Sequence, residues 1–151
     1  MKKSIQYKSM MNEYSLKLKK SDFHSSKINS SQAAYEAIKQ FYYDDMEIYE
    51  SFFILLLNRA NNTTGYVKIS QGGITGTVVD PRIIAKYVLE SLSCGIILAH
   101  NHPSGNLKPS ECDIALTKKV KECLSFCECT VIDHLIVTGE GFLSFADEGY
   151  L

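Results

Sequence analysis

The sequence predicts a single α/β domain. Two continuous apolar runs have the length of buried strands, and segments with helical periodicity and capping residues lie before, between and after them. The length of 151 residues suits one ordinary domain. With 45% hydrophobic and 22% charged residues, the composition is that of a folded globular chain. We therefore expect strands interleaved with three helices around one core.

The chain from residue 30 to residue 70 is predicted to form a helix and two strands. Serines at 30–31 suit the start of a helix that runs to about residue 43, with its apolar side chains on one face. The continuous apolar run 51–57 is typical of a central strand that is buried on both faces. A turn then leads to a second strand at about 66–70.

A glycine-rich segment, QGGITGTVVD, occupies residues 71–80. It lacks the Lys-Ser/Thr ending of a phosphate-binding loop and the glycine spacing of a dinucleotide site, so strand bending and tight turns are the simpler interpretation. Asp80 and Pro81 then suit the start of a helix that runs to about residue 92. The side chains expected on its buried face are Ile83, Ile84, Tyr87, Val88 and Leu92.

The last part of the chain predicts a strand, a helix and two more strands. The apolar segment 95–99 is typical of a buried strand, and it ends at two histidines. Ser110 suits the start of a helix that runs to about residue 127. Residues 130–137 and 142–146 are the remaining expected strands, joined by a turn that contains two glycines.

Residues 1–29 are predicted to form a basic arm ahead of a domain that spans residues 30–151. Residues 1–20 hold six lysines and one acid, a net charge of about +5, which leaves about -6 for the rest of the chain. Such an arm suits contact with DNA, although a solvated chain end is the commoner meaning. We find neither a signal-peptide pattern nor an apolar run that could cross a bilayer, so we expect a cytoplasmic protein without a membrane partner.

The cysteine pattern favours reduced thiols. Five cysteines are an odd number without a paired CxxC arrangement, which argues against a disulfide framework. Cys123, Cys127 and Cys129 lie close together in the sequence, so either they are buried side chains or they form a second metal site. Burial is the simpler interpretation, because Cys123 and Cys127 would be neighbours on one turn of a helix.

The segment with the clearest chemistry contains His100, His102 and Asp113. Residues i and i+2 of a strand point to the same face, so the two histidines can present their imidazoles to one point. Asp113 falls in the first turn of the following helix and can reach back to them. Two imidazoles and one carboxylate leave a fourth tetrahedral position for water, as in catalytic zinc sites. Such a site lowers the pKa of the bound water to about 7. We therefore predict one Zn²⁺ per chain, held by these three residues.

Each half of this pattern also has a simpler explanation. Taken alone, two histidines at a strand end are more often hydrogen-bonded polar residues than metal ligands. Ser110 and Asp113 suit a capping box at the start of a helix, which needs no metal. Capping and ligation are compatible, however, because a short carboxylate at a helix start is well placed for both.

The spacing of these residues resembles a known metalloprotease signature. His100, His102, Ser110 and Asp113 match the pattern HxH-x7-S-x2-D of the JAMM (JAB/MPN-type) metalloproteases. The surrounding sequence segments ILAHNHPSG, PSECD, IDHLIV and SFADEG resemble one particular family of this kind, the RadC family, over about residues 31–151. The resemblance implies a three-layer α/β domain whose mixed central sheet is flanked by helices, as in JAB/MPN and cytidine-deaminase-like proteins.

The resemblance also implies roles for further residues. Glu50, just before the first central strand, would be the general base on the zinc-bound water and later the proton donor to the leaving amine. Glu47 is the alternative if the register is shifted. Ser110 would donate a hydrogen bond to the oxyanion of the tetrahedral intermediate. His134, in the sequence Asp133-His134, is either a group that hydrogen-bonds near the site or simply a strand residue. Two residues beside the histidines are expected to orient substrate or to shape the loop: Asn101 and Ser104.

The function predicted from these residues is that of a zinc-dependent hydrolase of the metallopeptidase or isopeptidase type, acting on a peptide or protein substrate. The alternative is a DNA-associated accessory module of DNA repair or mobile elements, with a structural or vestigial metal site. The helix-hairpin-helix region that longer RadC proteins carry is not found here, so the family's DNA-repair label transfers poorly. A zinc deaminase would need HxE and PCxxC motifs that are absent beside the histidines. A metal-free scaffold is disfavoured because all three ligands are present. The sequence specifies neither the substrate nor the oligomeric state.

Overall fold

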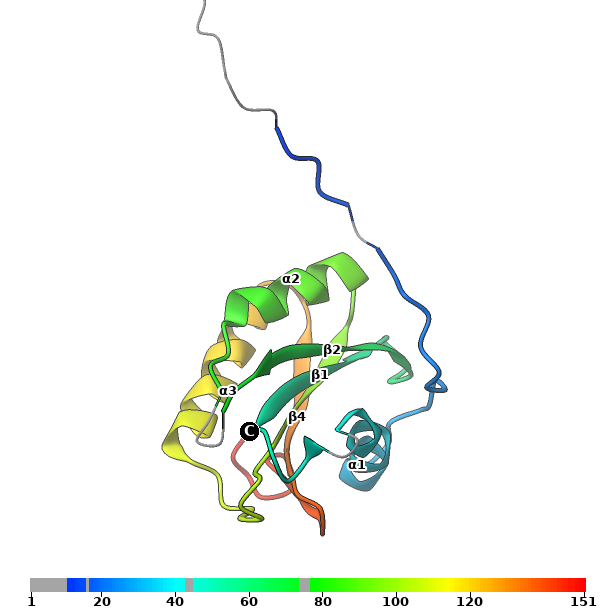
Figure 1. Ribbon diagram of the computed structural model, residues 1–151. Helices are drawn as coiled ribbons and strands as arrows, with labels where there is room; N and C mark the ends of the chain where they lie inside the picture. The colour runs from blue at the N-terminus through cyan, green and yellow to red at the C-terminus, as the bar shows by residue number, and fades with distance from the viewer. Residues whose placement is uncertain (1–10, 16, 43–44, 74–76) are drawn as a thin grey trace, which may run out of the picture.

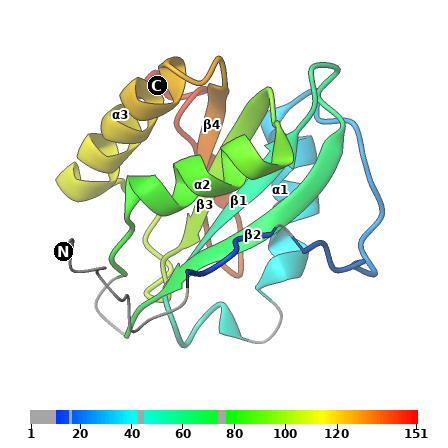
Figure 2. The same cartoon turned by 90° about the horizontal axis from the view of Figure 1, so that it is seen from above.

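The computed structural model describes residues 11–15, 17–42, 45–73 and 77–151. The elements in chain order are α1 (Ser31–Ile38), the short 3₁₀ helix η1 (Lys39–Phe41), β1 (Ser51–Leu57), β2 (Thr63–Gln71), α2 (Pro81–Ser91), β3 (Gly95–Asn101), α3 (Glu111–Ser125), β4 (Thr130–Val137) and β5 (Phe142–Ser144). Figure 1 and Figure 2 show one sheet with α2 and α3 on one face and α1 on the other. The predicted single α/β domain with a mixed sheet between helices is confirmed.

The sheet has the strand order β2-β1-β3-β4-β5, which places β3 at its centre. β3 pairs antiparallel with β1 and parallel with β4, and the two outer pairs are antiparallel. α3 lies between β3 and β4 in the chain, because parallel neighbours need a crossover connection. In the β1–β3 register, Phe52 lies opposite His100. The end of β3 that carries the histidines is therefore paired on both sides.

The alternation of side chains along the strands produces two separate cores. Toward α1, the buried sheet residues include Phe53, Leu55, Leu57, Ile97, Ala99, Leu135 and Val137. Toward α2 and α3, they include Phe52, Ile54, Leu56, Ile96, Leu98 and Val131. All seven residues of β1 and all seven of β3 are buried, as the continuous apolar runs predict. Consecutive residues of β3 therefore point into different layers.

The helices begin at the predicted residues, but α1 and α3 end before the predicted ones. Ser30 caps α1 by accepting a hydrogen bond from the Ala33 N–H, but the α-helical part stops at Ile38 and continues as η1. The expected end near residue 43 falls partly outside the described residues. Asp80 caps α2, with Pro81 at its first position. The remaining helix, α3, ends two residues before the predicted boundary.

Two of the residues predicted to be buried on α2 are exposed. Ile84 and Val88 are fully buried, but Ile83 is 41% exposed and Leu92 is 83% exposed. Ile83 lies one position, or about 100°, away from the buried face of the helix. Leu92 is the C-cap residue and adopts a left-handed conformation with φ of 51°, so it leaves the helical path. The prediction was wrong for Ile83 and Leu92.

Several sequence predictions concern segments that are only partly described. Residues 1–10 and 16 of the proposed basic arm lie outside the described residues, as do residues 74–76 of the glycine-rich segment. Lys17, Lys19 and Lys20 are exposed, whereas Ile28 is buried and its N–H donates to the Asn61 carbonyl. The boundary between residues 29 and 30 stays a prediction. Among the described residues, no helix is long and apolar enough to cross a membrane.

The double burial of β3 leads to a stability prediction. Leu98→Ala removes a fully buried side chain between β3 and the α2–α3 layer, so we expect it to lower the free energy of unfolding by about 2–5 kcal/mol. Leu89→Ala on the exposed side of α2 is the matched control and should change stability by less than about 0.5 kcal/mol. Urea denaturation followed by circular dichroism measures both. Equal effects of the two substitutions would contradict the assignment of Leu98 to the core.

Candidate metal centre

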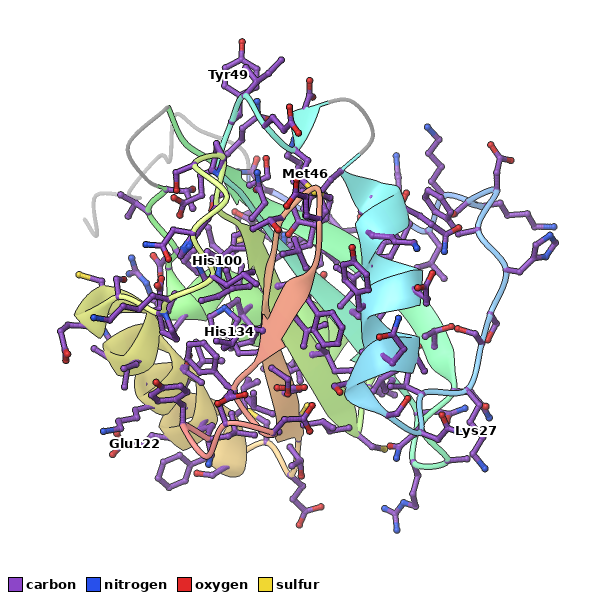
Figure 3. The ribbon with its side chains drawn as sticks, turned by 90° about the horizontal axis from the view of Figure 1, so that it is seen from below. Lys27, Met46, Tyr49, His100, Glu122 and His134 are labelled. Atoms are coloured by element: carbon purple, nitrogen blue, oxygen red, sulfur yellow. The ribbon has the colours of Figure 1, made fainter. Side chains whose placement is uncertain are left out.

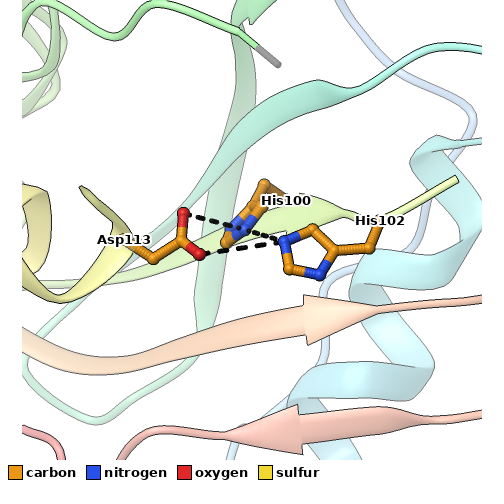
Figure 4. Close-up of side chains that lie close together, drawn as sticks. All are labelled: His100, His102 and Asp113. Atoms are coloured by element: carbon orange, nitrogen blue, oxygen red, sulfur yellow. Dashed lines mark hydrogen bonds and ion pairs between the residues drawn. The ribbon is translucent and has the colours of Figure 1, made fainter. Parts of the chain in front are cut away.

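β3 places His100 and His102 at one end of the central strand. His100 is 1% exposed, and its ring stacks on the Phe52 ring at 5.9 Å between centroids with 8° between the planes. His102 follows the end of β3, and its backbone N–H donates to the Val137 carbonyl at 3.1 Å, which prolongs the pairing with β4. Its side chain is 17% exposed. As predicted from the spacing, both imidazoles lie on the same side of the sheet, toward α3 (Figure 4).

Asp113 is fixed by the capping box at the start of α3. The Ser110 hydroxyl accepts a hydrogen bond from the Asp113 N–H at 3.1 Å. Asp113 Oδ2 in turn accepts from both the backbone N–H and the hydroxyl of Ser110, each at 2.7 Å. The capping box that the sequence predicts is therefore complete. It leaves Oδ1 of Asp113 facing His100.

The three side chains converge on one point. The Nε2 atoms of His100 and His102 are 3.0 Å apart, His100 Nε2 is 3.3 Å from Asp113 Oδ1, and His102 Nε2 is 3.8 Å from Asp113 Oδ2. Figure 4 shows them facing one another. A tetrahedral zinc ion with bonds of about 2.0–2.1 Å separates its ligand atoms by about 3.3 Å, so these residues fit such an ion. In the part of the chain that the structure describes, no other group of three or more His, Cys, Asp or Glu has this geometry.

The cysteines do not provide a second centre of this kind. All five are free thiols, and Cys123, Cys127 and Cys129 do not form a metal-binding group within the described ranges. Cys129 is buried, and burial raises the pKa of its thiol to about 11. Burial, the simpler of the two interpretations, therefore accounts for Cys129.

Hydrogen bonds and charge determine the protonation of two of the candidate metal ligands, Asp113 and His102. Burial acts to raise the pKa of Asp113, but the hydrogen bond and charge of His100 in its protonated form, together with the hydrogen bonds from Ser110, outweigh it and hold that pKa well below its usual range. Asp113 is therefore a carboxylate at neutral pH. The Nδ1 atom of His102 is 2.6 Å from the Asn106 carbonyl oxygen. Because a carbonyl only accepts, His102 carries a proton on Nδ1 and turns Nε2 toward Asp113.

His134 lies directly behind His100. It comes from β4 and is fully buried, and its Nε2 is 2.8 Å from His100 Nδ1 (Figure 3). Its Nδ1 is 2.7 Å from the hydroxyl oxygen of Thr117 on α3. Burial, reinforced by His100, lowers the pKa of His134 well below its usual value. Of the two interpretations that the sequence allows, a group that hydrogen-bonds near the site is the one observed.

Asn101 points into the opposite layer and holds the segment before β1. Its Nδ2 donates to the Met46 carbonyl at 2.6 Å and to the Tyr49 carbonyl at 2.7 Å. Its Oδ1 accepts from the Ser51 N–H at 2.7 Å. The side chain is fully buried, and Figure 3 shows Met46 and Tyr49 on the segment beyond the histidines. Asn101 therefore fixes the backbone on both sides of Glu50.

Glu50 and Glu47 occupy different places. Glu50 is half-buried, and its carbonyl accepts from the Gly72 N–H at 2.8 Å. Continuing the antiparallel register of Phe52 with His100 by two residues places Glu50 opposite His102. The Glu47 carboxylate instead lies beside Gly139 in the turn between β4 and β5, so close that a Cβ on that glycine would be 3.0 Å from Glu47 Oε1. The register thus favours Glu50 over Glu47 as the acid nearest the histidines.

Comparison with known proteins agrees with this geometry. The family described as the RadC-like JAB domain matches residues 28–150. The chain belongs to the RadC-like JAB domain family. Curated relatives are each named UPF0758 protein: one from Flavobacterium johnsoniae is 45% identical over 67% of this chain and 44% of its own length. One from Porphyromonas gingivalis is 40% identical over 82% of this chain and 54% of its own length. The chain therefore spans about half the length of these relatives, and the RadC-like match covers the whole site.

One residue of this RadC-like site was missed by the sequence analysis. Thr117 is 1% exposed and lies one helical turn after Asp113, on the face of α3 that also carries Val120 and Leu124. A polar residue at a position of the buried stripe was the available signal, because such a residue needs a hydrogen-bond partner. Ser104, in contrast, is exposed, and its hydroxyl accepts from the Asn106 N–H at 3.4 Å, which fits a role in shaping the loop.

The contacts of Asn101 predict how the site segment depends on it. Asn101→Ala leaves two carbonyls of the segment before β1 and the N–H of the first β1 residue without their partner, and each buried polar group left unpaired costs about 1–3 kcal/mol. We expect a lower free energy of unfolding in urea and faster hydrogen exchange at the Ser51 amide. Asn101→Asp keeps the acceptor but turns an anion toward the two carbonyls, so it should destabilise at least as much. Unchanged Ser51 exchange in Asn101→Ala would show that the side chain does not hold this segment.

Proposed function

We propose that this chain is a zinc-dependent hydrolase of the metallopeptidase or isopeptidase type, using a water molecule activated by Glu50. The observation that carries the proposal is the convergence of His100 Nε2, His102 Nε2 and the Asp113 carboxylate: the two nitrogens are 3.0 Å apart, His100 Nε2 is 3.3 Å from Oδ1, and His102 Nε2 is 3.8 Å from Oδ2. Membership of the RadC-like JAB domain family supports it. The substrate class follows from the family-level resemblance and is part of the proposal.

The donor set suits a catalytic ion better than a structural one. His100, His102 and Asp113 would hold the ion, and zinc in such a site supplies a Lewis acid that makes water nucleophilic at neutral pH. Structural zinc sites are usually closed by four protein ligands, whereas this group has three. The side chains of His102 and Asp113 are 17% and 15% exposed, so the group is not sealed from solvent.

Glu50 and Ser110 would complete the reaction. Glu50 takes a proton from the attacking water and returns it to the leaving amine, and its register position opposite His102 supports this role. Asn101 would hold Glu50 in place through the backbone of residues 49 and 51. The Ser110 hydroxyl donates to Asp113 Oδ2 in the structure, so donation to an oxyanion requires this hydroxyl to turn. Such a donor stabilises the charge that develops in the transition state.

The first test is metal content measured by inductively coupled plasma mass spectrometry on protein purified without a metal-affinity tag. We expect about one zinc per chain in the wild type and almost none in the double variant His100→Ala/His102→Ala, because two of the three ligands are lost. His24→Ala is the matched control, since His24 is an exposed histidine far from the group in sequence, and it should keep its zinc. A wild type that contains no metal and takes none up from added zinc would refute the proposal.

Hydrolysis is tested next, on the zinc-loaded wild type and a Glu50→Gln variant. Glu50→Gln keeps the size of the side chain and removes the base, so we expect normal zinc content with a rate at least about 10²-fold lower. Peptides and isopeptide-linked conjugates are the substrates to screen, with product release followed by mass spectrometry. If Glu50→Gln turns over as fast as the wild type, Glu50 is not the base, and Glu47→Gln becomes the variant to measure.

A further inference from the structure

Three buried polar side chains form a row behind the candidate metal centre. His100 on β3, Thr117 on α3 and His134 on β4 are each 1% exposed or less. Their surroundings are apolar, since the rings of Phe52 and Phe145 contact the His134 ring. Within the described residues, every buried side-chain nitrogen and oxygen has a hydrogen-bond partner. In such a place polar groups satisfy one another, and the direction of each hydrogen bond follows from what each atom can donate.

The hydroxyl group of Thr117 determines the direction of the hydrogen bonds in this row. Its hydroxyl oxygen is 2.6 Å from the Asp113 carbonyl oxygen and 2.7 Å from His134 Nδ1. A carbonyl carries no proton, so the single hydroxyl proton of Thr117 lies between the two oxygens. The hydroxyl oxygen therefore accepts from His134, and the proton of the neutral His134 ring is on Nδ1.

The position of the proton on His134 determines the position of the proton on His100. With its proton on Nδ1, His134 presents a lone pair at Nε2, which lies 2.8 Å from His100 Nδ1. His100 must then donate from Nδ1, and in the neutral ring of His100 the lone pair is left on Nε2. That Nε2 is the atom that faces His102 Nε2 at 3.0 Å and Asp113 Oδ1 at 3.3 Å.

We propose that Thr117 and His134 are positioning residues that hold His100 in its Nδ1–H tautomer and fix its ring, so that the Nε2 lone pair faces the metal position. The part of this inference that concerns the metal rests on the proposed function. The tautomer of His100 rests on the hydrogen bonds alone. Partners of this kind behind a ligating histidine orient the ring and raise its basicity. The chain of bonds also closes on Asp113, whose carbonyl accepts from Thr117, so it links two of the three proposed ligands.

A purely structural role is the competing explanation. Thr117 bonds the carbonyl one turn earlier in its own helix, as buried threonines often do, and His134 fills space between aromatic rings. That explanation predicts a loss of stability when either residue is changed and no effect on the tautomer of His100. The experiment therefore needs a readout of the His100 ring itself and a readout of affinity.

The experiment compares Thr117→Val with Thr117→Ser. Valine keeps the shape and removes the hydroxyl, so His134 Nδ1 loses its acceptor and the proton can shift to Nε2, which forces the His100 proton onto its own Nε2. Serine keeps the hydroxyl. Long-range ¹H–¹⁵N correlation spectra of the histidine rings, recorded on metal-free protein, report the tautomers. We expect His100 in the Nδ1–H form in the wild type and in Thr117→Ser, and a mixture or the Nε2–H form in Thr117→Val.

Affinity for Zn²⁺ and Co²⁺, measured by competition with a chromophoric chelator, gives the second readout. We expect Thr117→Val to bind both ions about 10–100-fold more weakly, and Thr117→Ser to stay within about threefold of the wild type. An Nε2–H tautomer of His100 in the wild type would overturn the inference, and this outcome does not depend on whether any variant folds. Equal affinity and equal tautomers in Thr117→Val and wild type would overturn it as well. If the wild type binds neither ion, the proposed function fails, while the spectra still decide the tautomer.

Discussion

Strand β3 is hydrogen-bonded along both edges and covered by helices on both faces, and the layout of the site depends on this constraint. In a strand held in this way, neighbouring side chains must point into different layers. His100 therefore faces α3, and Asn101 faces the α1 layer. Three consecutive residues thus carry two of the proposed ligands and the residue that holds the Glu50 segment. A shift of β3 by one residue would turn the two histidines toward the α1 layer and Asn101 toward α3.

The start of α3 adds a second constraint. Its first turn needs partners for free backbone N–H groups, and the capping box supplies them through Ser110 and Asp113. The same carboxylate then offers its other oxygen to His100, at 3.3 Å from His100 Nε2. The helix start and the candidate metal centre therefore share one side chain. This sharing explains why the capping and metal interpretations of the sequence did not exclude each other.

Much of the fold was predictable because local patterns determine it. The boundaries of β1 and β4 agree with the predicted ranges, since β1 is a continuous apolar run and β4 is rich in β-branched and other apolar residues. The capping residues Ser30, Asp80 and Ser110 were predictable for the same local reason. The exposure of Leu92 was not, because a left-handed residue at a helix end breaks the periodicity on which the prediction relies. Periodicity also gave too wide a buried face for α2.

For the site, the sequence was informative about residues close together in the chain and silent about contacts between distant elements. The spacing of His100, His102 and Asp113 indicated a common point, and the structure brings them together. The contact of His100 with His134 depends on the parallel register of β3 and β4, which shifts by one residue between Ile96 and Ile97. Thr117 enters only because α3 packs over that pair. No local pattern specifies a register shift or a packing position of this kind.

The proposed ligands all come from the short stretch 100–113, and this has a consequence for how the protein behaves when it is partly unfolded. Closing a short loop costs little chain entropy, so this stretch can gather around a cation even when the sheet is incomplete. Glu50 comes opposite His102 only when β1 pairs with β3, a contact between distant parts of the chain. Retention of an ion and the proposed hydrolysis would therefore depend on different amounts of native structure. An ion that also binds the unfolded chain stabilises the native fold less than its affinity alone would imply.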